Sequence, residues 1–192
     1  MEQKTFIRIP GDRIGVLIGA DGKTRRRIES AFGVKITVES ESGGVTVKVN
    51  EDQPDVSVMF TVKNIVKAIG RGFNPKKAMT LQDEDNDLIV IDLEEFVGTS
   101  KNAQNRVRGR IIGKEGKSRE LLEELTNCLV SVYGGTVAVI GPYEMLQVAK
   151  EAVEMLLNGS YHKTVWNHLY AYRRKMRKEK GELWYEPARR RT

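Results

Sequence analysis

Cysteine is almost absent from this chain of 192 residues, which carries a single thiol at Cys128. One cysteine cannot form an internal disulfide and cannot by itself build a zinc cluster. The sequence therefore excludes a disulfide scaffold and favours a reducing, cytoplasmic compartment. No apolar run approaches the roughly 20 residues that span a bilayer. The first residues lead directly into a strand-like segment, so we expect no secretory or transit peptide.

Groups that support catalysis are equally scarce. His162 and His168 are six residues apart and fall on different faces of a helix, with no cysteine or carboxylate at metal-ligand spacing. Cys128 aligns with Val34 in the internal repeat described below, which predicts a core thiol rather than a nucleophile. The acidic residues at 83–87 could imitate the metal cluster of a nuclease, but no matching base accompanies them. We therefore expect no enzyme, no cofactor and no bound metal.

Positive charge is concentrated at one end of the chain. The net charge is +6, yet residues 160–192 hold ten basic and three acidic residues, whereas residues 1–159 hold 22 basic and 23 acidic ones. A polyanion is therefore attracted mainly to the C-terminal segment. The stretch 82–95 is the opposite pole, with seven acidic residues and no basic one. It either faces a basic protein partner or forms a solvated surface. We prefer the second interpretation, because most charge runs of this kind are solvated.

An internal repeat organises the sequence. When the chain is shifted by 94 positions, residues 17–25 align with residues 111–119, glycine on glycine, and apolar positions continue in register. A period of this size predicts two copies of one domain rather than a solenoid. Each copy of about 70–80 residues is small for a core of its own, so we expect the two to pack together as one body.

Both copies predict the same element order, β-α-α-β-β-α. The first copy predicts strands over 5–9, 35–39 and 45–49 and helices over 12–18, 23–32 and 55–69, the last closed by Gly70. The second predicts strands over 88–93, 129–133 and 136–140 and helices over 105–112, 117–126 and 142–157, with Pro142 in the first turn of the last. A short connecting helix is expected within 73–80.

The first two helices of each copy are joined by a Gly-x-x-Gly loop, at Gly19 and Gly22 and again at Gly113 and Gly116. Glycines accept a positive φ and let another backbone come close. The second helix begins at this loop, so its free N–H groups and its positive dipole end point outward. Basic side chains stand in that first turn, and a sugar–phosphate strand can run along this edge.

Both loops are preceded by isoleucine and followed by Lys-[Thr/Ser]-Arg, and in this element order the two copies resemble type I KH domains. A KH domain clamps four nucleotides of single-stranded RNA at its GXXG loop. The resemblance implies an α+β fold with two tandem KH domains, each a three-stranded antiparallel sheet with three helices, packed together, followed by a basic amphipathic helix. The domain boundaries we expect are 1–72 for the first KH domain, 73–83 for the connecting helix, 84–159 for the second KH domain and 160–192 for the C-terminal helix and tail.

The RNA-binding residues that follow from the loops and the basic helix are Ile18, Gly19, Ala20, Asp21, Gly22, Lys23, Arg25, Arg26, Ile112, Gly113, Lys114, Glu115, Gly116, Lys117, Arg119, Arg173, Arg174 and Lys175. The first loop departs from the basic pattern, because Ala20-Asp21 brings an acid and no base to the phosphate path. In the second loop Lys114 supplies a cation, which Glu115 partly offsets. We therefore expect the second domain to contribute more to RNA binding.

Two further stretches point to one family. Residues 68–78 read Ala-Ile-Gly-Arg-Gly-Phe-Asn-Pro-Lys-Lys-Ala, and Leu-Leu-Asn-Gly-Ser at 156–160 is followed by Lys-Thr-Val-Trp-Asn at 163–167. Together with the tandem KH pattern, they resemble the archaeal form of the KH-domain ribosome-assembly factors known as the partner of the Nob endonuclease, the Dim-two family. The resemblance implies binding near the 3′ end of small-subunit ribosomal RNA. It also implies contact with the Nob-type endonuclease and with the α subunit of translation initiation factor two.

The C-terminal segment predicts an amphipathic helix over 161–180. Val165, Leu169, Tyr172 and Met176 form one apolar stripe, and basic residues cluster from Arg173 onward. We expect the stripe to dock the helix across both KH domains, while the basic face extends the RNA path. The helix has too little apolar surface for a membrane. Two alternatives remain for the whole chain: a protein-interaction scaffold whose KH domains bind little RNA, and a metal-dependent nuclease.

Overall fold

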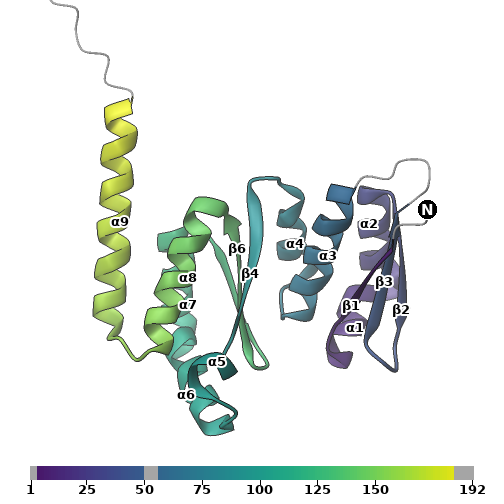
Figure 1. Ribbon diagram of the computed structural model, residues 1–192, viewed down its shortest axis with the longest axis horizontal. Coiled ribbons are helices and arrows are strands. Elements are labelled where there is room, and N and C mark those ends of the chain that lie inside the picture. The colour runs from purple at the N-terminus through teal and green to yellow at the C-terminus, as the bar shows by residue number, and fades with distance from the viewer. Residues whose placement is uncertain (1–3, 50–55, 184–192) are drawn as a thin grey trace, which may run out of the picture.

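The computed structural model describes residues 4–49 and 56–183 (Figure 1). The first domain is a three-stranded antiparallel sheet, in the order β1-β3-β2, with helices on one face. Its elements are β1 (Lys4–Arg8), α1 (Gly11–Ile18), α2 (Lys23–Phe32), β2 (Val34–Glu39), β3 (Gly44–Val49) and α3 (Val56–Gly70). Val45, Val47 and Val49 of the central strand are buried. The expected start of the third helix at Asp55 lies outside the described residues.

The second domain repeats this architecture, with the strand order β4-β6-β5. Its elements are β4 (Asn86–Asp92), α5 (Glu94–Val97), α6 (Lys101–Ile112), α7 (Lys117–Thr126), β5 (Leu129–Tyr133), β6 (Thr136–Pro142) and α8 (Tyr143–Leu157). α6 begins four residues before the predicted position, because the Ser100 hydroxyl caps it by accepting from the Ala103 N–H at 3.4 Å. Pro142 ends β6 and precedes α8, so its placement in the first turn of that helix was wrong.

The two domains stack in alternating layers of sheet and helices (Figure 1). The helices of the first domain lie between the first sheet and the second sheet, and α6, α7 and α8 cover the other face of the second sheet. On β6, Ala138 and Ile140 join the core of the first domain, whereas Val137 and Val139 join that of the second. Because strand side chains alternate between faces, one strand serves both cores. The expectation that the copies pack together is confirmed.

A short helical connector leads from α3 to β4. It consists of α4 (Pro75–Ala78) and the single 3₁₀ turn η2 (Met79–Gln82). The Asn74 side chain caps α4 by accepting from the Lys76 N–H at 2.8 Å. Phe73 and Ala78 are buried in the first core, so the connector is packed against α3 rather than hanging free.

Two glycines at the end of α3 allow close contacts with different parts of the protein. Gly70 is the last residue of α3, one position beyond the predicted end at Ile69, and a Cβ there would come within 2.6 Å of Cγ2 of Ile9. The chain turns at Gly72, which has a φ of +94°. A Cβ on Gly72 would lie 2.6 Å from Cβ of Tyr133 and 2.7 Å from Oγ of Ser131, both on β5. Gly72 is therefore a point of close approach between the domains.

Two arginines hold the ends of the third helix of each domain. Arg13 donates from Nε to the Ile69 carbonyl at 2.8 Å and from Nη2 to the Phe73 carbonyl at 2.7 Å. Arg110 does the same at the end of α8, to the carbonyls of Leu156 and Ser160, at 3.1 and 2.5 Å. The positive charge offsets the negative end of the helix dipole in both places.

The C-terminal helix α9 (His162–Leu183) packs against α7 and α8 of the second domain. Val165 and Leu169 are buried in the second core, and Tyr172 packs against it. The expectation that this helix docks across both domains was wrong. The short turn through Gly159, whose φ is +89°, folds α9 back along α8, on the side away from the first domain (Figure 1). A connection this short makes the two helices antiparallel neighbours.

Candidate nucleic-acid interface

The two GXXG loops have nearly identical backbones. In the first, Gly19 has a φ of +73° and Gly22 a φ of +74°; in the second, Gly113 has +72° and Gly116 +81°. The third residue of each loop is also left-handed, at +51° for Asp21 and +56° for Glu115. Each loop closes through a hydrogen bond from its last glycine N–H to its first glycine carbonyl, at 3.2 and 3.3 Å. The two loops that the sequence repeat aligns therefore also share one backbone conformation.

The two glycines of each loop are needed for different reasons. A Cβ on Gly113 would lie 2.5 Å from Cβ of Ser118, and one on Gly19 would overlap the Thr24 side chain, so the first glycine allows close packing. The second glycine opens outward, and a Cβ on Gly22 would meet nothing within 4 Å in the described chain. The second glycine is also the N-cap of the next helix, and no side chain caps that end in either copy, so the positive end of the helix dipole lies beside the loop.

Charge is arranged differently around the two loops. In the first, Nη2 of Arg26 donates to the Asp21 carbonyl at 2.5 Å, which holds a cation over the acidic loop. In the second, Nζ of Lys117 lies 3.4 Å from Oε2 of Glu115. Lys114 is exposed, and no acidic side chain of the described residues pairs with it. The second loop therefore presents the more available positive charge.

The remaining predicted side chains surround these loops at the starts of α2 and α7. Lys23 is exposed and stands directly after the first loop. Arg25 and Arg119 occupy the same place in the two copies, and both are half-buried. Ile18 and Ile112, which precede the loops, are half-buried as well. The structure thus brings fifteen of the predicted residues into two matching clusters, one in each domain.

A pair of glutamates that sequence reasoning missed ties each loop-bearing helix to the neighbouring edge strand. Oε1 of Glu29 accepts from the Ile36 N–H, and Oε1 of Glu123 accepts from the Val130 N–H, both at 2.8 Å. These carboxylate bonds are charge-assisted and fix the helix against the sheet. The signal was present, because the two glutamates are related by the same shift of 94 positions.

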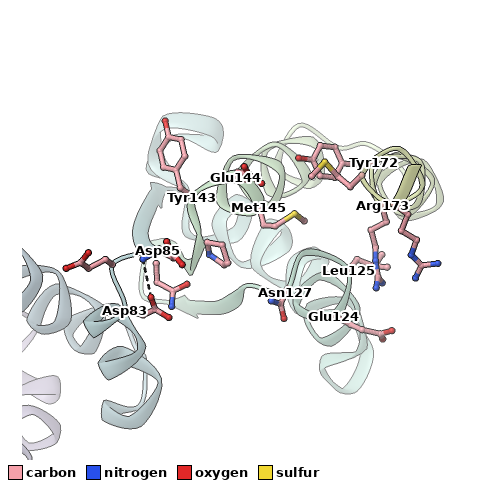
Figure 2. Close-up of a pocket in the computed structure, with 15 residues that line it drawn as sticks. Asp83, Asp85, Glu124, Leu125, Asn127, Tyr143, Glu144, Met145, Tyr172 and Arg173 are labelled. Carbon is pink, nitrogen blue, oxygen red and sulfur yellow. Dashed lines mark hydrogen bonds between the residues drawn. The ribbon is translucent and has the colours of Figure 1, made fainter. Parts of the chain in front are cut away.

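The structure does not bring the basic residues of α9 to either loop. Arg173 and Arg177 line a cavity of about 860 Å³ together with Glu124, Leu125 and other residues near the end of α7, whose beginning carries the second loop. At 1.5 Å per residue, Lys117 and Leu125 are about 12 Å apart along that helix. Figure 2 shows Arg173 on the α9 side of this cavity and Asp83 and Asp85 on the opposite side. Arg174 is exposed, and Nζ of Lys175 lies 3.8 Å from Oε1 of Glu179.

No metal site is formed by the described part of the chain, where no three histidine, cysteine or acidic side chains are grouped to hold an ion. His162 Nε2 lies 2.8 Å from the Arg110 carbonyl, and His168 Nε2 lies 3.4 Å from Oε2 of Glu151. Both histidines thus have structural neighbours in the second domain. Within this described part of the chain, no helix is long and apolar enough to cross a bilayer.

Cys128 is a core thiol, as predicted. Its side chain is buried between the second sheet and its helices, and burial raises the pKa of the thiol to about 11. At pH 8 the folded protein therefore holds the unreactive, protonated form. The stability that this shift contributes is fully present below the ordinary thiol pKa of 9.0 and is lost as the pH rises through about 11.

We predict that an aromatic disulfide reagent at pH 8 labels the native protein at least 100-fold more slowly than the protein unfolded in urea, because the thiolate fraction and the access are both small. The released chromophore reports the rate. Equal labelling rates in the two states would contradict a buried thiol. Faster labelling of the native protein than of the unfolded protein would show that Cys128 is a reactive nucleophile.

The comparisons with known proteins agree with this geometry. Residues 4–70 match the KH domain family, and residues 87–174 match the eukaryotic type KH-domain, KH-domain type I. A KH domain-containing protein of Methanocaldococcus jannaschii is 46% identical over 179 residues, which are 93% of this chain and 78% of the relative.

Three solved structures are similar over nearly the whole chain. The crystal structure of Dim2p from Pyrococcus horikoshii has a TM-score of 0.83 at 41% identity, covering 88% of this chain and 99% of that one. A chain in the a/eIF2alpha–aDim2p–rRNA complex from the same organism has 0.86 at 40% identity, covering 91% and 96%. A protein of unknown function from Aeropyrum pernix has 0.91 at 37% identity, covering 96% and 98%.

The family resemblance that rested on the paired loops and on the stretches after α3 and α8 is thus confirmed by sequence over most of the chain and by the tandem arrangement. The chain belongs to the archaeal Dim2 family of tandem KH-domain proteins.

Proposed function

We propose that this protein is a non-catalytic factor in assembly of the small ribosomal subunit that binds single-stranded RNA near the 3′ end of the small-subunit ribosomal RNA. The observation that carries this proposal is the duplicated loop. Two glycine turns of the same conformation open outward at the starts of α2 and α7, each with basic side chains beside the positive end of a helix that no side chain caps. The KH type of both domains and the related structure named as a complex with rRNA support it.

Each predicted residue has a defined task in this proposal. The sugar–phosphate backbone runs past the glycines and the residues between them, and Ile18 and Ile112 form the floor of a groove for unstacked bases. The basic side chains that neutralise phosphates at the loops are Lys23, Arg25, Arg26, Lys114, Lys117 and Arg119. Arg173, Arg174 and Lys175 act from α9 as a separate electrostatic patch, since Arg173 lines a cavity with Glu124 and Leu125 near the far end of α7 and the other two follow it on α9.

The proposed partners follow from the family. A solved complex names a/eIF2alpha beside aDim2p and rRNA, which supports the α subunit of translation initiation factor two as a partner of this chain. The family resemblance also leads us to propose the Nob-type endonuclease as a partner and the cytoplasm as the location of the protein.

The test is a titration of a labelled oligonucleotide from the 3′ end of small-subunit ribosomal RNA with the full chain. RNA binding by KH grooves predicts salt-sensitive affinity, with a slope near −0.7 for each neutralised phosphate. Tight binding of the protein partners with no RNA affinity would favour the scaffold alternative. RNA cleavage by the purified chain upon addition of a divalent metal would favour a nuclease.

Neutralising the α9 patch by the triple substitution Arg173→Gln, Arg174→Gln and Lys175→Gln should weaken RNA binding about 3- to 10-fold and flatten the salt slope by up to about 2, at 0.7 per phosphate. The same titration at several salt concentrations measures both. Lys163→Gln, an exposed lysine at the beginning of α9, is the control and should change neither. Unchanged curves for the triple variant would remove α9 from the RNA-binding surface.

A further inference from the structure

The connector helix α4 lies between the two loop-bearing helices. On one side, Asn74, Pro75 and Lys76 share a cavity of about 270 Å³ with the first turns of α2. On the other side, Nζ of Lys77 lies 3.7 Å from Oε1 of Glu123 on α7. A strand that follows the first loop therefore meets α4 before it reaches the second domain.

The chemistry of this cavity is that of an anion site. Lys23, Arg27 and Lys76 line it and carry three positive charges, and no acidic residue is among its described lining residues. Arg27 offers a planar fork that suits a phosphate, and the lysines add mobile point charges. The Asn74 side chain uses its oxygen to cap α4, which leaves its amide N–H groups for a ligand.

Three apolar residues also line the cavity, namely Ile28, Pro75 and Met79. A lining that combines basic donors with apolar side chains suits the phosphate and the sugar of a nucleic-acid backbone better than a free inorganic ion. The volume lies just below the roughly 300 Å³ at which pockets for drug-sized ligands begin, so the cavity takes one backbone unit rather than a larger ligand.

The cavity also adjoins the first GXXG loop. Lys23 follows Gly22 directly, and it lines the cavity together with Arg27, one helical turn further along α2. Glu29, by contrast, is engaged with the edge strand β2. The cavity thus opens on the side of α2 that faces α4, as a continuation of the path past the loop.

We propose that the cavity between α2 and α4 binds a phosphate of an RNA strand that runs from the first GXXG loop over α4 toward the second domain. The two KH domains then hold one continuous strand, and Lys76 and Arg27 are RNA-binding residues between them. This inference rests on the proposed function and adds the path of the RNA strand between the two domains.

The experiment uses two single-stranded RNAs, one of four nucleotides, which a single GXXG loop can hold, and one of about 20 nucleotides, which can reach both domains. Full-length wild type, Lys76→Gln, Arg27→Gln and the double variant are titrated at several salt concentrations. For the long RNA we expect a loss of about 3- to 10-fold per substitution and a salt slope flatter by about 0.7 for the double variant. The affinity for the short RNA should stay within about twofold of wild type.

Lys101→Gln is the matched control, because Lys101 is an exposed lysine at the beginning of α6, outside the cavity. If wild type binds neither RNA, the proposed function itself fails. If wild type binds the long RNA and the double variant binds it equally well, the proposed function stands and this inference is wrong. Stabilisation of wild type by inorganic phosphate that the double variant loses, with RNA affinity unchanged, would assign the cavity to a free anion and would also overturn the RNA path.

Discussion

Reversing the charge of the second loop with Lys114→Asp should weaken binding of a ribosomal 3′-end oligonucleotide about 10- to 30-fold at low salt, because one phosphate contact is lost and a repulsive charge takes its place. Lys114 is exposed and, among the described residues, has no acidic partner, so the substitution removes an available cation rather than a structural ion pair. The salt slope should flatten by about 0.7 or more. Fluorescence anisotropy at several salt concentrations measures both quantities.

Two variants make this result specific. Lys101→Asp changes the charge of the same domain by the same amount, at an exposed position far along α6 from the loop, and should alter affinity by less than about threefold. Ala20→Asp places a second acid in the first loop and should weaken binding less than Lys114→Asp does, since Asp21 already opposes phosphate there. If Lys114→Asp leaves the affinity unchanged, the second loop does not hold the RNA backbone.

Adding one methyl group at Gly72 should destabilise the protein by about 3–5 kcal/mol, a large effect for so small a change. Two costs combine. A left-handed backbone costs a residue with a Cβ about 1–2 kcal/mol, and Gly72 has a φ of +94°. The new Cβ would also lie 2.6 Å from Cβ of Tyr133, on a strand of the other domain, so the domains must separate locally. Urea denaturation of Gly72→Ala gives the free energy of unfolding.

Gly159→Ala is the matched control. Gly159 follows α8 as Gly72 follows α3, with a φ of +89°, but a Cβ there would meet no described atom within 4 Å. It should therefore cost only the backbone strain of about 1–2 kcal/mol. The difference between the two variants isolates the contact between the domains. Equal losses would show that the packing of Gly72 against β5 contributes nothing to stability.

The sequence by itself determined the duplicated unit, its element order and the position of both loops. These features are local, because a strand alternates every two residues, a helix ends at glycine, and a turn that needs positive φ selects for Gly19, Gly22, Gly113 and Gly116. The predicted helix over Lys23–Phe32 has the observed bounds for the same reason, since Gly33 after it adopts a φ of +62°.

Only the tertiary structure decided what covers each face. The apolar pattern of β6 shows that both faces are buried, but Ala138 and Ile140 say nothing about which helices they meet. The apolar stripe of α9 likewise predicted that the helix packs against the protein, but not which domain it contacts. The short turn at Gly159 places α9 on the second domain. Arg27 and Lys76 are 49 positions apart, and their shared cavity exists because the connector packs against the first domain. Periodicity encodes that a face is apolar, whereas the choice of partner depends on shape and on the cost of closing long loops between distant segments.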